Sequence, residues 1–173
     1  MAAITVYIGV GSNLGNRQEN LRRGIRAIGR RVTITAASSI YETEPWGFLD
    51  QPPFLNAVCS GLTSMSALDL LELLKDAEAL VGRRPTFLNG PRKFDADLLL
   101  YGGQLIDEVT LQVPHPRLAQ RAFVLEPLAE IAPELVHPLE ELSIRQLLDR
   151  VSGRQGVRRW SEPLMTVTPM KLP

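Results

Sequence analysis

Apolar residues recur along the chain at the spacings of strands and helices, separated by polar segments. Residues 4–10, 54–62 and 94–101 are apolar runs whose length and β-branched or bulky side chains predict buried strands. Residues 32–41 alternate loosely between apolar and polar positions and predict a further strand, and residues 109–113 predict a short one. The chain therefore contains enough strand-forming segments for one sheet.

Helix signals lie between these runs. Asn16, with Glu19 three positions later, is typical of a helix start, and the apolar residues that follow share one helical face up to Gly29. Ser66 begins a second amphipathic helix that ends before Gly82. Both helices are expected to pack an apolar face against the sheet.

The last third of the chain is less regular. Residues 115–133 are interrupted by prolines and predict turns mixed with a helix. Ser143 begins a last helix, and the segment beyond Gly153 is expected to be a tail. We therefore predict one domain over residues 1–160, followed by a C-terminal tail over residues 161–173.

Two longer irregular segments, residues 43–53 and 83–93, interrupt the pattern, and each contains prolines and a glycine. Ordered loops of this length are often functional. Strands and helices alternate without a strict βαβ order. This order favours an α+β fold with a mainly antiparallel sheet.

The composition of the 173 residues is that of a soluble globular protein, with 45% hydrophobic and 22% charged residues. Lys plus Arg and Asp plus Glu number 19 each, and this neutral balance argues against a dedicated nucleic-acid-binding protein. No apolar run approaches a membrane span, and the first residues lack a signal-peptide pattern. The single cysteine, Cys59, cannot form an intrachain disulfide. We expect a cytoplasmic monomer that acts on small molecules, not on nucleic acids or membranes.

Asp95 and Asp97 are the clearest candidates for chemistry. They lie two residues apart in an apolar strand, so both carboxylates are expected on one face, with Ala96, Leu98 and Leu100 on the other. Such a pair suits Mg²⁺, which keeps several waters and bridges to phosphates. A solvated strand face with two ordinary acids fits the spacing equally well.

Arginines upstream of the pair favour the functional interpretation. Arg92 precedes the pair closely, and Arg83 and Arg84 lie a little earlier. Guanidinium groups donate paired hydrogen bonds to charged oxygens, as a polyphosphate ligand requires. Glu78 falls near the apolar face of the second helix, where a carboxylate needs a partner or a ligand. Alternatively, Glu78 reaches past the helix end toward Arg83 or Arg84.

Other polar residues carry weaker signals. Phe54 and Asn56 point the same way on a strand, so an aromatic plane and an amide could bind a flat heterocycle together. On these two residues alone, a core phenylalanine beside an asparagine is the better interpretation. His115 stands between two prolines near Arg121 and could reach a phosphate or a metal, although a lone histidine is more often structural. His137 is expected at the surface.

Several motifs occur together in the order and spacing of a known family. They are Gly11-Ser12-Asn13-Leu14-Gly15, Tyr41-x-Thr43-x-Pro45-x-Gly47, Asp50-Gln51-Pro52-x-Phe54-x-Asn56, Gly90-Pro91-Arg92-x-x-Asp95-x-Asp97-Leu98-Leu99, Val113-Pro114-His115-Pro116-Arg117 and Arg121-x-Phe123-Val124-Leu125-x-Pro127-Leu128. Over roughly residues 4–150 the sequence resembles the 6-hydroxymethyl-7,8-dihydropterin pyrophosphokinase family. The resemblance implies a ferredoxin-like, three-layer α+β domain. It also implies transfer of pyrophosphate from ATP to the hydroxymethylpterin, with release of AMP, in folate biosynthesis.

The resemblance further implies roles for individual residues. By similarity, Asp95 and Asp97 would hold two Mg²⁺ ions. The pterin would be bound by Thr43, Glu44, Trp46, Phe54, Asn56 and Phe123. The co-substrate ATP would be bound by Lys75, Glu78, Arg92, Leu98, His115, Pro116 and Arg121. The catalytic groups would be the two aspartates with Arg83, Arg84 and Arg92. Residues 83–89 would form a mobile loop that closes over the phosphates, and the family often has an arginine where this chain has Leu88.

Two other functions stay open from the residues alone. Another Mg²⁺-dependent transferase with an Asp-x-Asp pair, acting on a nucleotide or a sugar nucleotide, would release pyrophosphate or a nucleoside diphosphate instead of AMP. An RNA-binding ferredoxin-like module would use the arginine-rich first helix. Such a module would tolerate loss of Asp95 but not loss of Arg22 and Arg23.

Overall fold

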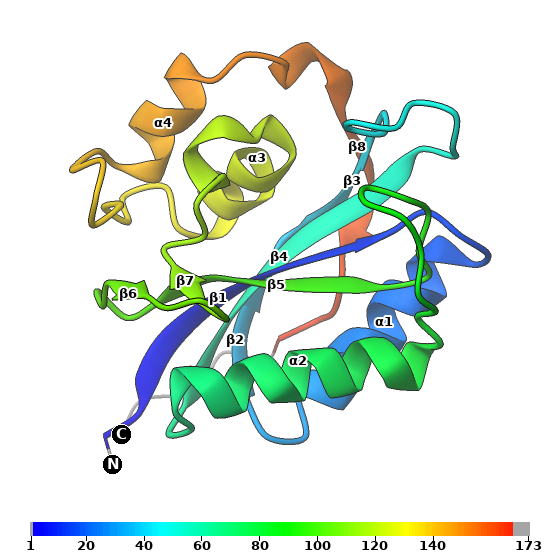
Figure 1. Ribbon diagram of the computed structural model, residues 1–173. Helices are drawn as coiled ribbons and strands as arrows, with labels where there is room; N and C mark the ends of the chain where they lie inside the picture. The colour runs from blue at the N-terminus through cyan, green and yellow to red at the C-terminus, as the bar shows by residue number, and fades with distance from the viewer. Residues whose placement is uncertain (1, 168–173) are drawn as a thin grey trace.

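One six-stranded antiparallel sheet forms the centre of the computed structural model, which describes residues 2–167 (Figure 1). Its strands are β1 (Ile4–Ser12), β2 (Thr33–Ala37), β3 (Ser39–Thr43), β4 (Phe54–Thr63), β5 (Asp95–Tyr101) and β8 (Val157–Pro163). They follow the order β5-β1-β4-β3-β8, and β2 pairs with the end of β4 that β3 leaves free. The strand expected at residues 109–113 is limited to β7 (Gln112–Val113), which pairs with β6 (Ile106–Asp107) in a separate ribbon.

In this part of the chain, residues 2–167, four α-helices cover the sheet (Figure 1). One face carries α1 (Arg17–Ile28) and α2 (Ala67–Val81), and the other carries α3 (Ala122–Ile131) and α4 (Ile144–Arg150). A separate buried apolar cluster lies under each pair of helices. The predicted α+β fold, with helices packed on a mainly antiparallel sheet, is confirmed. Within the described residues, no helix combines the length and apolarity needed to cross a membrane.

The caps at the helix ends confirm the predicted boundaries. Asn16 Oδ1 accepts a hydrogen bond of 3.1 Å from the N–H of Glu19 at the start of α1. Ser66 caps α2, and Gly82 ends it in the left-handed conformation at φ 100°. Ser143 begins α4 with a complete capping box.

The close approach of α1 to the sheet depends on Gly24. A Cβ atom at this position would lie 2.0 Å from Phe94 Cζ. Phe94 is fully buried and directly precedes β5. A glycine in α1 therefore lets the helix pack over the start of the strand that carries Asp95 and Asp97.

The single strand expected over residues 32–41 is wrong, because this segment forms both β2 and β3. Ser38 lies between them. Its N–H donates to Val58 O, and its hydroxyl accepts from the Val58 N–H, each at 2.9 Å. The Ser38 hydroxyl thus takes the place of a backbone carbonyl as the acceptor for Val58, and the strand is interrupted at Ser38.

The tail expected beyond Gly153 is also wrong. A 3-10 turn leads into β8, which pairs with β3 at the sheet edge, and Leu164 is buried in the cluster under α1 and α2. Polar side chains dominate β8, so hydrophobic periodicity could not reveal it. The expected boundary after residue 160 falls inside this strand, and residues 168–173 of the expected tail lie outside the described residues.

Two smaller predictions, the side of β5 on which Leu100 lies and the exposure of His137, are wrong for local structural reasons. The register of β5 against β1 shifts between Tyr7 and Ile8, which leaves Leu99 as an extra residue. Leu99 and Leu100 therefore both pack under α3 and α4, so Leu100 does not lie opposite the aspartates. His137 is buried, not exposed, because its Nδ1 accepts hydrogen bonds from two backbone N–H groups of the following turn.

Candidate active site

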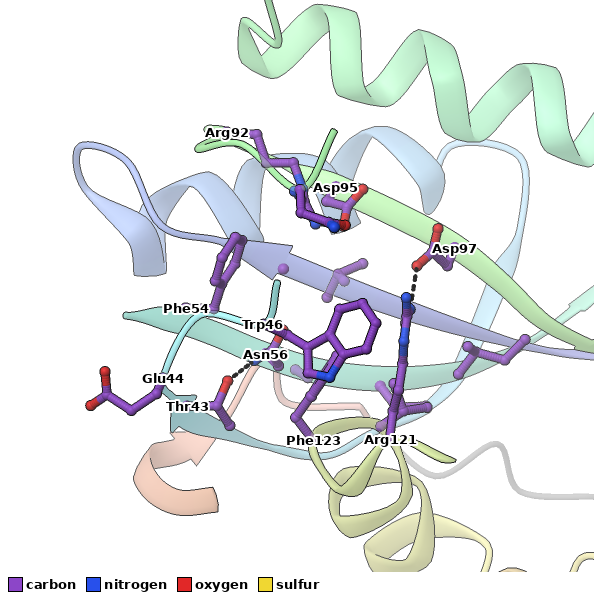
Figure 2. A pocket seen from close by; sticks show the side chains of 18 residues that line it. Thr43, Glu44, Trp46, Phe54, Asn56, Arg92, Asp95, Asp97, Arg121 and Phe123 are labelled. Atoms are coloured by element: carbon purple, nitrogen blue, oxygen red, sulfur yellow. Dashed lines mark hydrogen bonds and ion pairs between the residues drawn. The ribbon is translucent and has the colours of Figure 1, made fainter. Parts of the chain in front are cut away.

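A cleft of about 680 Å³, including its open mouth, lies on the α3 side of the sheet (Figure 2). Strands β1, β4 and β5 line it from the sheet, and the start of α3 and two loops line it from above. Most of the predicted site residues meet here, namely Thr43, Glu44, Trp46, Phe54, Asn56, Arg92, Asp95, Asp97, Arg121 and Phe123. The cleft therefore joins segments that are far apart in the sequence.

One end of the cleft has the features of a site for a flat heterocycle. Phe54 and Asn56 project from the same face of β4, as strand alternation predicts, and Phe123 faces the cleft from α3 (Figure 2). Asn56 Nδ2 donates a hydrogen bond of 2.8 Å to Thr43 Oγ1. A Cβ atom at Gly11 would come within 3.0 Å of Asn56 Oδ1, so the glycine makes room for the amide. Two aromatic side chains and an amide of fixed orientation surround this end.

The loop of residues 44–53 closes this end from above. Trp46 is about half exposed, and its ring centroid lies 5.2 Å from Arg117 Cζ and 5.7 Å from Arg121 Cζ. Its indole lies beside Arg121 (Figure 2). The carboxylate of Glu44 points away from the cleft, so Glu44 presents its backbone to the cavity.

The other end of the cleft carries both predicted aspartates, next to three arginines and a histidine. Asp95 Oδ2 lies 3.0 Å from Arg92 Nη2, and Asp95 Oδ1 lies 3.3 Å from Arg83 Nη1. Asp97 Oδ2 lies 3.9 Å from Arg121 Nη1 (Figure 2) and 4.0 Å from His115 Nε2. The predicted placement of both carboxylates on one face of β5 is confirmed.

Asp97 is held in an environment that disfavours its negative charge. The low solvation of the cleft, and then the charge of Asp95, raise the pKa of Asp97 to about 7. Arg121 and Arg92 act in the opposite direction. A bound cation would relieve the repulsion between the two carboxylates.

This donor set fits Mg²⁺ shared with a phosphate ligand. Within residues 2–167, no group of three or more His, Cys, Asp or Glu side chains is arranged to hold a metal. Mg²⁺ commonly takes one or two carboxylates from a protein and completes its coordination with waters and substrate phosphates. Asp95 and Asp97 match this requirement, and they are the residues that would hold the metal.

Two guanidinium groups in the cleft retain unused hydrogen-bond donors. The Nε atoms of Arg92 and Arg121 are buried and have no partner among the described residues. A buried donor without a partner is unfavourable in a folded protein. Burial also lowers the pKa of Arg121. Both donors are therefore available to an anionic ligand at this end of the cleft.

Glu78 is both a buried carboxylate with a partner and a partner of Arg83, so it combines the two alternatives that the sequence left open. It is buried, and its Oε1 accepts a hydrogen bond of 2.9 Å from the N–H of Ala96 on β5. It also forms an ion pair with Arg83, which in turn reaches Asp95. Burial raises the pKa of Glu78. Glu78 thus connects α2 to the aspartate strand and to the loop that follows α2.

A second hollow adjoins the cleft between α2 and this loop. Residues from both elements line it, including Lys75, Glu78, Arg83, Arg84, Leu88 and Arg92. Lys75 and Arg84, which were predicted for the nucleotide and the phosphates, therefore lie beside the main cleft. The two hollows share Asn89 and Arg92.

His115 approaches Asp97, whereas Leu98 and Pro116, also predicted for the nucleotide site, line neither hollow. The His115 Nδ1 accepts a hydrogen bond of 3.1 Å from the Arg117 N–H, so Nε2 carries the proton that faces Asp97. Burial and the nearby arginines lower the pKa of His115 to about 4. The Leu98 side chain packs under α1 and α2 instead, and Pro116 is exposed, so each could contribute only from outside the cleft surface.

Asn13 is a site residue to which sequence reasoning gave no role. It is buried, donates to Gln51 Oε1 at 2.9 Å and to Pro52 O at 3.0 Å, and accepts from the Arg92 N–H at 2.8 Å. It therefore joins the two loops that border the cleft. The glycine-rich motif at residues 11–15 was the available signal.

This chain is similar to known proteins over most of its length. Residues 7–133 match the family model described as 7,8-dihydro-6-hydroxymethylpterin-pyrophosphokinase (HPPK). A 2-amino-4-hydroxy-6-hydroxymethyldihydropteridine pyrophosphokinase from Bacillus subtilis is 39% identical over 158 residues, which cover 90% of this chain and 90% of that protein. The folic acid synthesis protein fol1 of Schizosaccharomyces pombe is 37% identical over 90% of this chain. This chain spans only 21% of the length of fol1.

The fold also matches solved structures. A crystal structure of wild-type Plasmodium falciparum HPPK-DHPS with pteroate aligns with a TM-score of 0.70, over 86% of this chain and 42% of that chain. At 14% sequence identity, this likeness concerns the fold. The family model covers most of the chain, and the B. subtilis relative is similar over nearly its full length. This chain therefore belongs to the 7,8-dihydro-6-hydroxymethylpterin-pyrophosphokinase family.

Proposed function

We propose that this protein transfers pyrophosphate from ATP to 6-hydroxymethyl-7,8-dihydropterin and releases AMP. One observation carries the proposal: a single cleft has a carboxylate pair among arginines at one end and an aromatic-amide site at the other. The first end suits a metal-bound polyphosphate, and the second suits a flat, polar-edged heterocycle. A donor and an acceptor substrate can therefore meet inside one chain, and we include action as a monomer in the proposal.

The pterin binds between Phe54 and Phe123. Asn56, oriented by its hydrogen bond to Thr43, pairs with the polar edge of the ring. Trp46 and the backbone at Glu44 close the site from the loop. The hydroxymethyl group then points along the cleft toward β5.

The triphosphate binds beside Asp95 and Asp97. Its oxygens accept hydrogen bonds from Arg92 and Arg121, whose Nε donors lack protein partners in the described residues. His115 is neutral near pH 7, because its pKa is about 4, and it donates from Nε2. These groups keep the β-phosphorus in reach of the pterin hydroxyl.

The protein contributes mainly position and charge to the transfer. The hydroxymethyl oxygen forms a bond to the β-phosphorus in line with the bond that breaks, its proton is released to water, and AMP leaves with the bridging oxygen. Arg92, and Arg83 and Arg84 from the loop after α2, stabilise the charge that develops on the phosphate oxygens. Two Mg²⁺ ions held by Asp95 and Asp97 would supply further charge neutralisation.

Product analysis tests the proposal. The protein is incubated with ATP, Mg²⁺ and 6-hydroxymethyl-7,8-dihydropterin, and the nucleotides are separated at several times. We expect one AMP for each pterin diphosphate formed, and no reaction when the pterin is omitted. Formation of ADP would contradict pyrophosphoryl transfer. Release of free pyrophosphate with the nucleotide joined to an acceptor would identify the alternative Asp-x-Asp nucleotidyltransferase.

A further inference from the structure

The C-terminal strand places one aromatic side chain against the start of α1. In the pairing of β8 with β3, Ser161 lies opposite Ile40 and Arg159 lies opposite Tyr41, so Trp160 is an extra residue between them. Such a bulge redirects the side chain that it carries. The Trp160 ring centroid lies 4.9 Å from Arg17 Cζ, in a cation-π contact.

Arg17, the first residue of α1, holds both ends of the loop that closes the pterin end of the cleft. Its Nη1 donates to Glu42 Oε2 and to the carbonyl oxygen of Pro53, each at 2.9 Å. Glu42 directly precedes Thr43, and Pro53 directly precedes Phe54. One guanidinium group therefore fixes the residue before each of two side chains that line the cleft.

The stack on Trp160 and the two hydrogen bonds use different parts of the same guanidinium. Arg17 Cζ lies over the Trp160 ring, and Nη1 donates both hydrogen bonds. Side chains of Arg17 and Glu42 are mostly buried, at 21% and 20% exposure, so their ion pair is partly shielded from water. Trp160 further restricts the rotamers of this long side chain.

We propose that Arg17 and Trp160 act together as positioning residues for the pterin site. The stack keeps Arg17 in place, and Arg17 in turn fixes the spacing between Thr43 on β3 and Phe54 on β4. Neither residue touches the cleft, and Trp160 lies outside residues 7–133 that match the family model. The identity of the ligand in this inference rests on the proposed function.

A merely structural role would give a different result from a positioning role. If β8 only stabilised the sheet edge, replacing Trp160 would lower the melting temperature and leave the two substrate affinities unchanged in the folded protein. A positioning role predicts a selective loss of pterin affinity, because ATP binds at the other end of the cleft. The affinities for pterin and ATP are therefore measured separately.

The experiment uses the full chain and four substitutions. Arg17→Met keeps the aliphatic stem and removes the hydrogen bonds, and Trp160→Leu removes the aromatic face. Trp160→Phe restores an aromatic ring, and Arg22→Met, at an exposed position of α1, is the matched control. Binding of 6-hydroxymethyl-7,8-dihydropterin is titrated by fluorescence in the presence of a non-hydrolysable ATP analogue and Mg²⁺. The analogue alone is titrated separately.

We expect Arg17→Met to raise the pterin Kd about tenfold and Trp160→Leu to raise it by about threefold or more. Trp160→Phe and Arg22→Met should stay within about twofold of wild type, as should every Kd for the nucleotide analogue. Equal pterin affinity in all variants would overturn the inference, as would a parallel loss of both affinities. If Arg17→Met does not fold, the comparison of Trp160→Leu with Trp160→Phe decides. If the wild-type protein binds no pterin, the proposed function itself is wrong.

Discussion

Asn56 Nδ2 lies 2.8 Å from Thr43 Oγ1, and this hydrogen bond links β4 to β3 at the aromatic end of the cleft. The bond uses one donor of the amide and fixes which way the rest of the group faces. Both residues are buried, so the amide is oriented before any ligand arrives.

Replacing Asn56 tests the pterin assignment. Asn56→Ala should weaken pterin binding by about 1–3 kcal/mol, because polar groups at the edge of the ring would be buried without partners. ATP affinity should barely change. Thr43→Val, which removes only the orienting partner, should have a smaller effect in the same direction. Titration of each substrate measures both, and a matching fall in ATP affinity would show that Asn56 is structural.

The loop after α2 should act mainly in the closed complex. Arg83→Ala and Arg84→Ala should lower kcat more than they lower ATP affinity, because a closing loop contributes mostly when both substrates are bound. Arg31→Ala, at an exposed position after α1, serves as the control. Steady-state kinetics and ATP titration separate the two quantities. Equal losses would instead make the loop a simple ATP clamp.

The same loop is predicted to be mobile without ligands and ordered with both substrates. It carries Arg83 and Arg84, is interrupted by proline, and exposes Leu88 where the family often has an arginine. Amide hydrogen exchange over residues 83–89 should slow most when a nucleotide analogue and pterin are both present. Protection by the nucleotide alone, with no further change when pterin is added, would contradict closure by the second substrate.

The raised pKa of Asp97 predicts that, without Mg²⁺, the protein loses stability as the pH rises. The folded-state pKa of about 7 exceeds the ordinary value of 3.8, so the folded protein holds this proton more tightly than the unfolded chain. The resulting stabilisation of the folded protein is fully present at a pH below the ordinary pKa of 3.8, and it is lost as the pH rises through about 7. Solvent screening reduces this change in stability, because the Asp97 side chain is partly exposed.

Asp97→Asn removes this titration and isolates its effect. In metal-free buffer the variant should melt higher than wild type at about pH 8, and the difference should shrink toward about pH 5. Thermal unfolding across this range measures it. Parallel curves for the two proteins would mean that Asp97 titrates near its ordinary pKa.

Local chemistry made much of the site predictable. Strand alternation placed Phe54 beside Asn56 and Asp95 beside Asp97, because successive side chains on a strand face opposite sides. Capping residues such as Ser66 marked helix ends, because the unpaired N–H groups of a first turn need an acceptor. The meeting of these strands with α3 in one cleft required the family resemblance.

Contacts between distant segments were not predictable in the same way. Arg17 meets Trp160 only because β8 adds to β3, and the polar sequence of β8 carries no periodic signal. Leu99 is an extra residue because the register of β5 against β1 shifts beside it. Such a shift depends on how the two strands pair, so the sequence of β5 alone does not indicate it. His137 is buried because its ring nitrogen satisfies backbone N–H groups, which residue type alone does not indicate.

Asp95 and Asp97 should be jointly essential to catalysis. Asp95→Asn or Asp97→Asn should each lower kcat by about a hundredfold or more while the fold is retained, because a neutral amide, which binds Mg²⁺ more weakly, replaces a charged carboxylate. Asp76→Asn, an exposed change on α2, should keep normal turnover. Paired measurements of kcat and melting temperature, with and without Mg²⁺, check this. Near-normal turnover in Asp97→Asn would refute the assignment.

The fate of the β-phosphate tests the central claim most directly. The protein is given Mg²⁺, 6-hydroxymethyl-7,8-dihydropterin and ATP that carries a radioactive label on the β-phosphorus only, and the products are separated. Attack at the β-phosphorus predicts that the label moves to the pterin and that the AMP is unlabelled. Label recovered in ADP, or in free pyrophosphate, would contradict pyrophosphoryl transfer by this cleft.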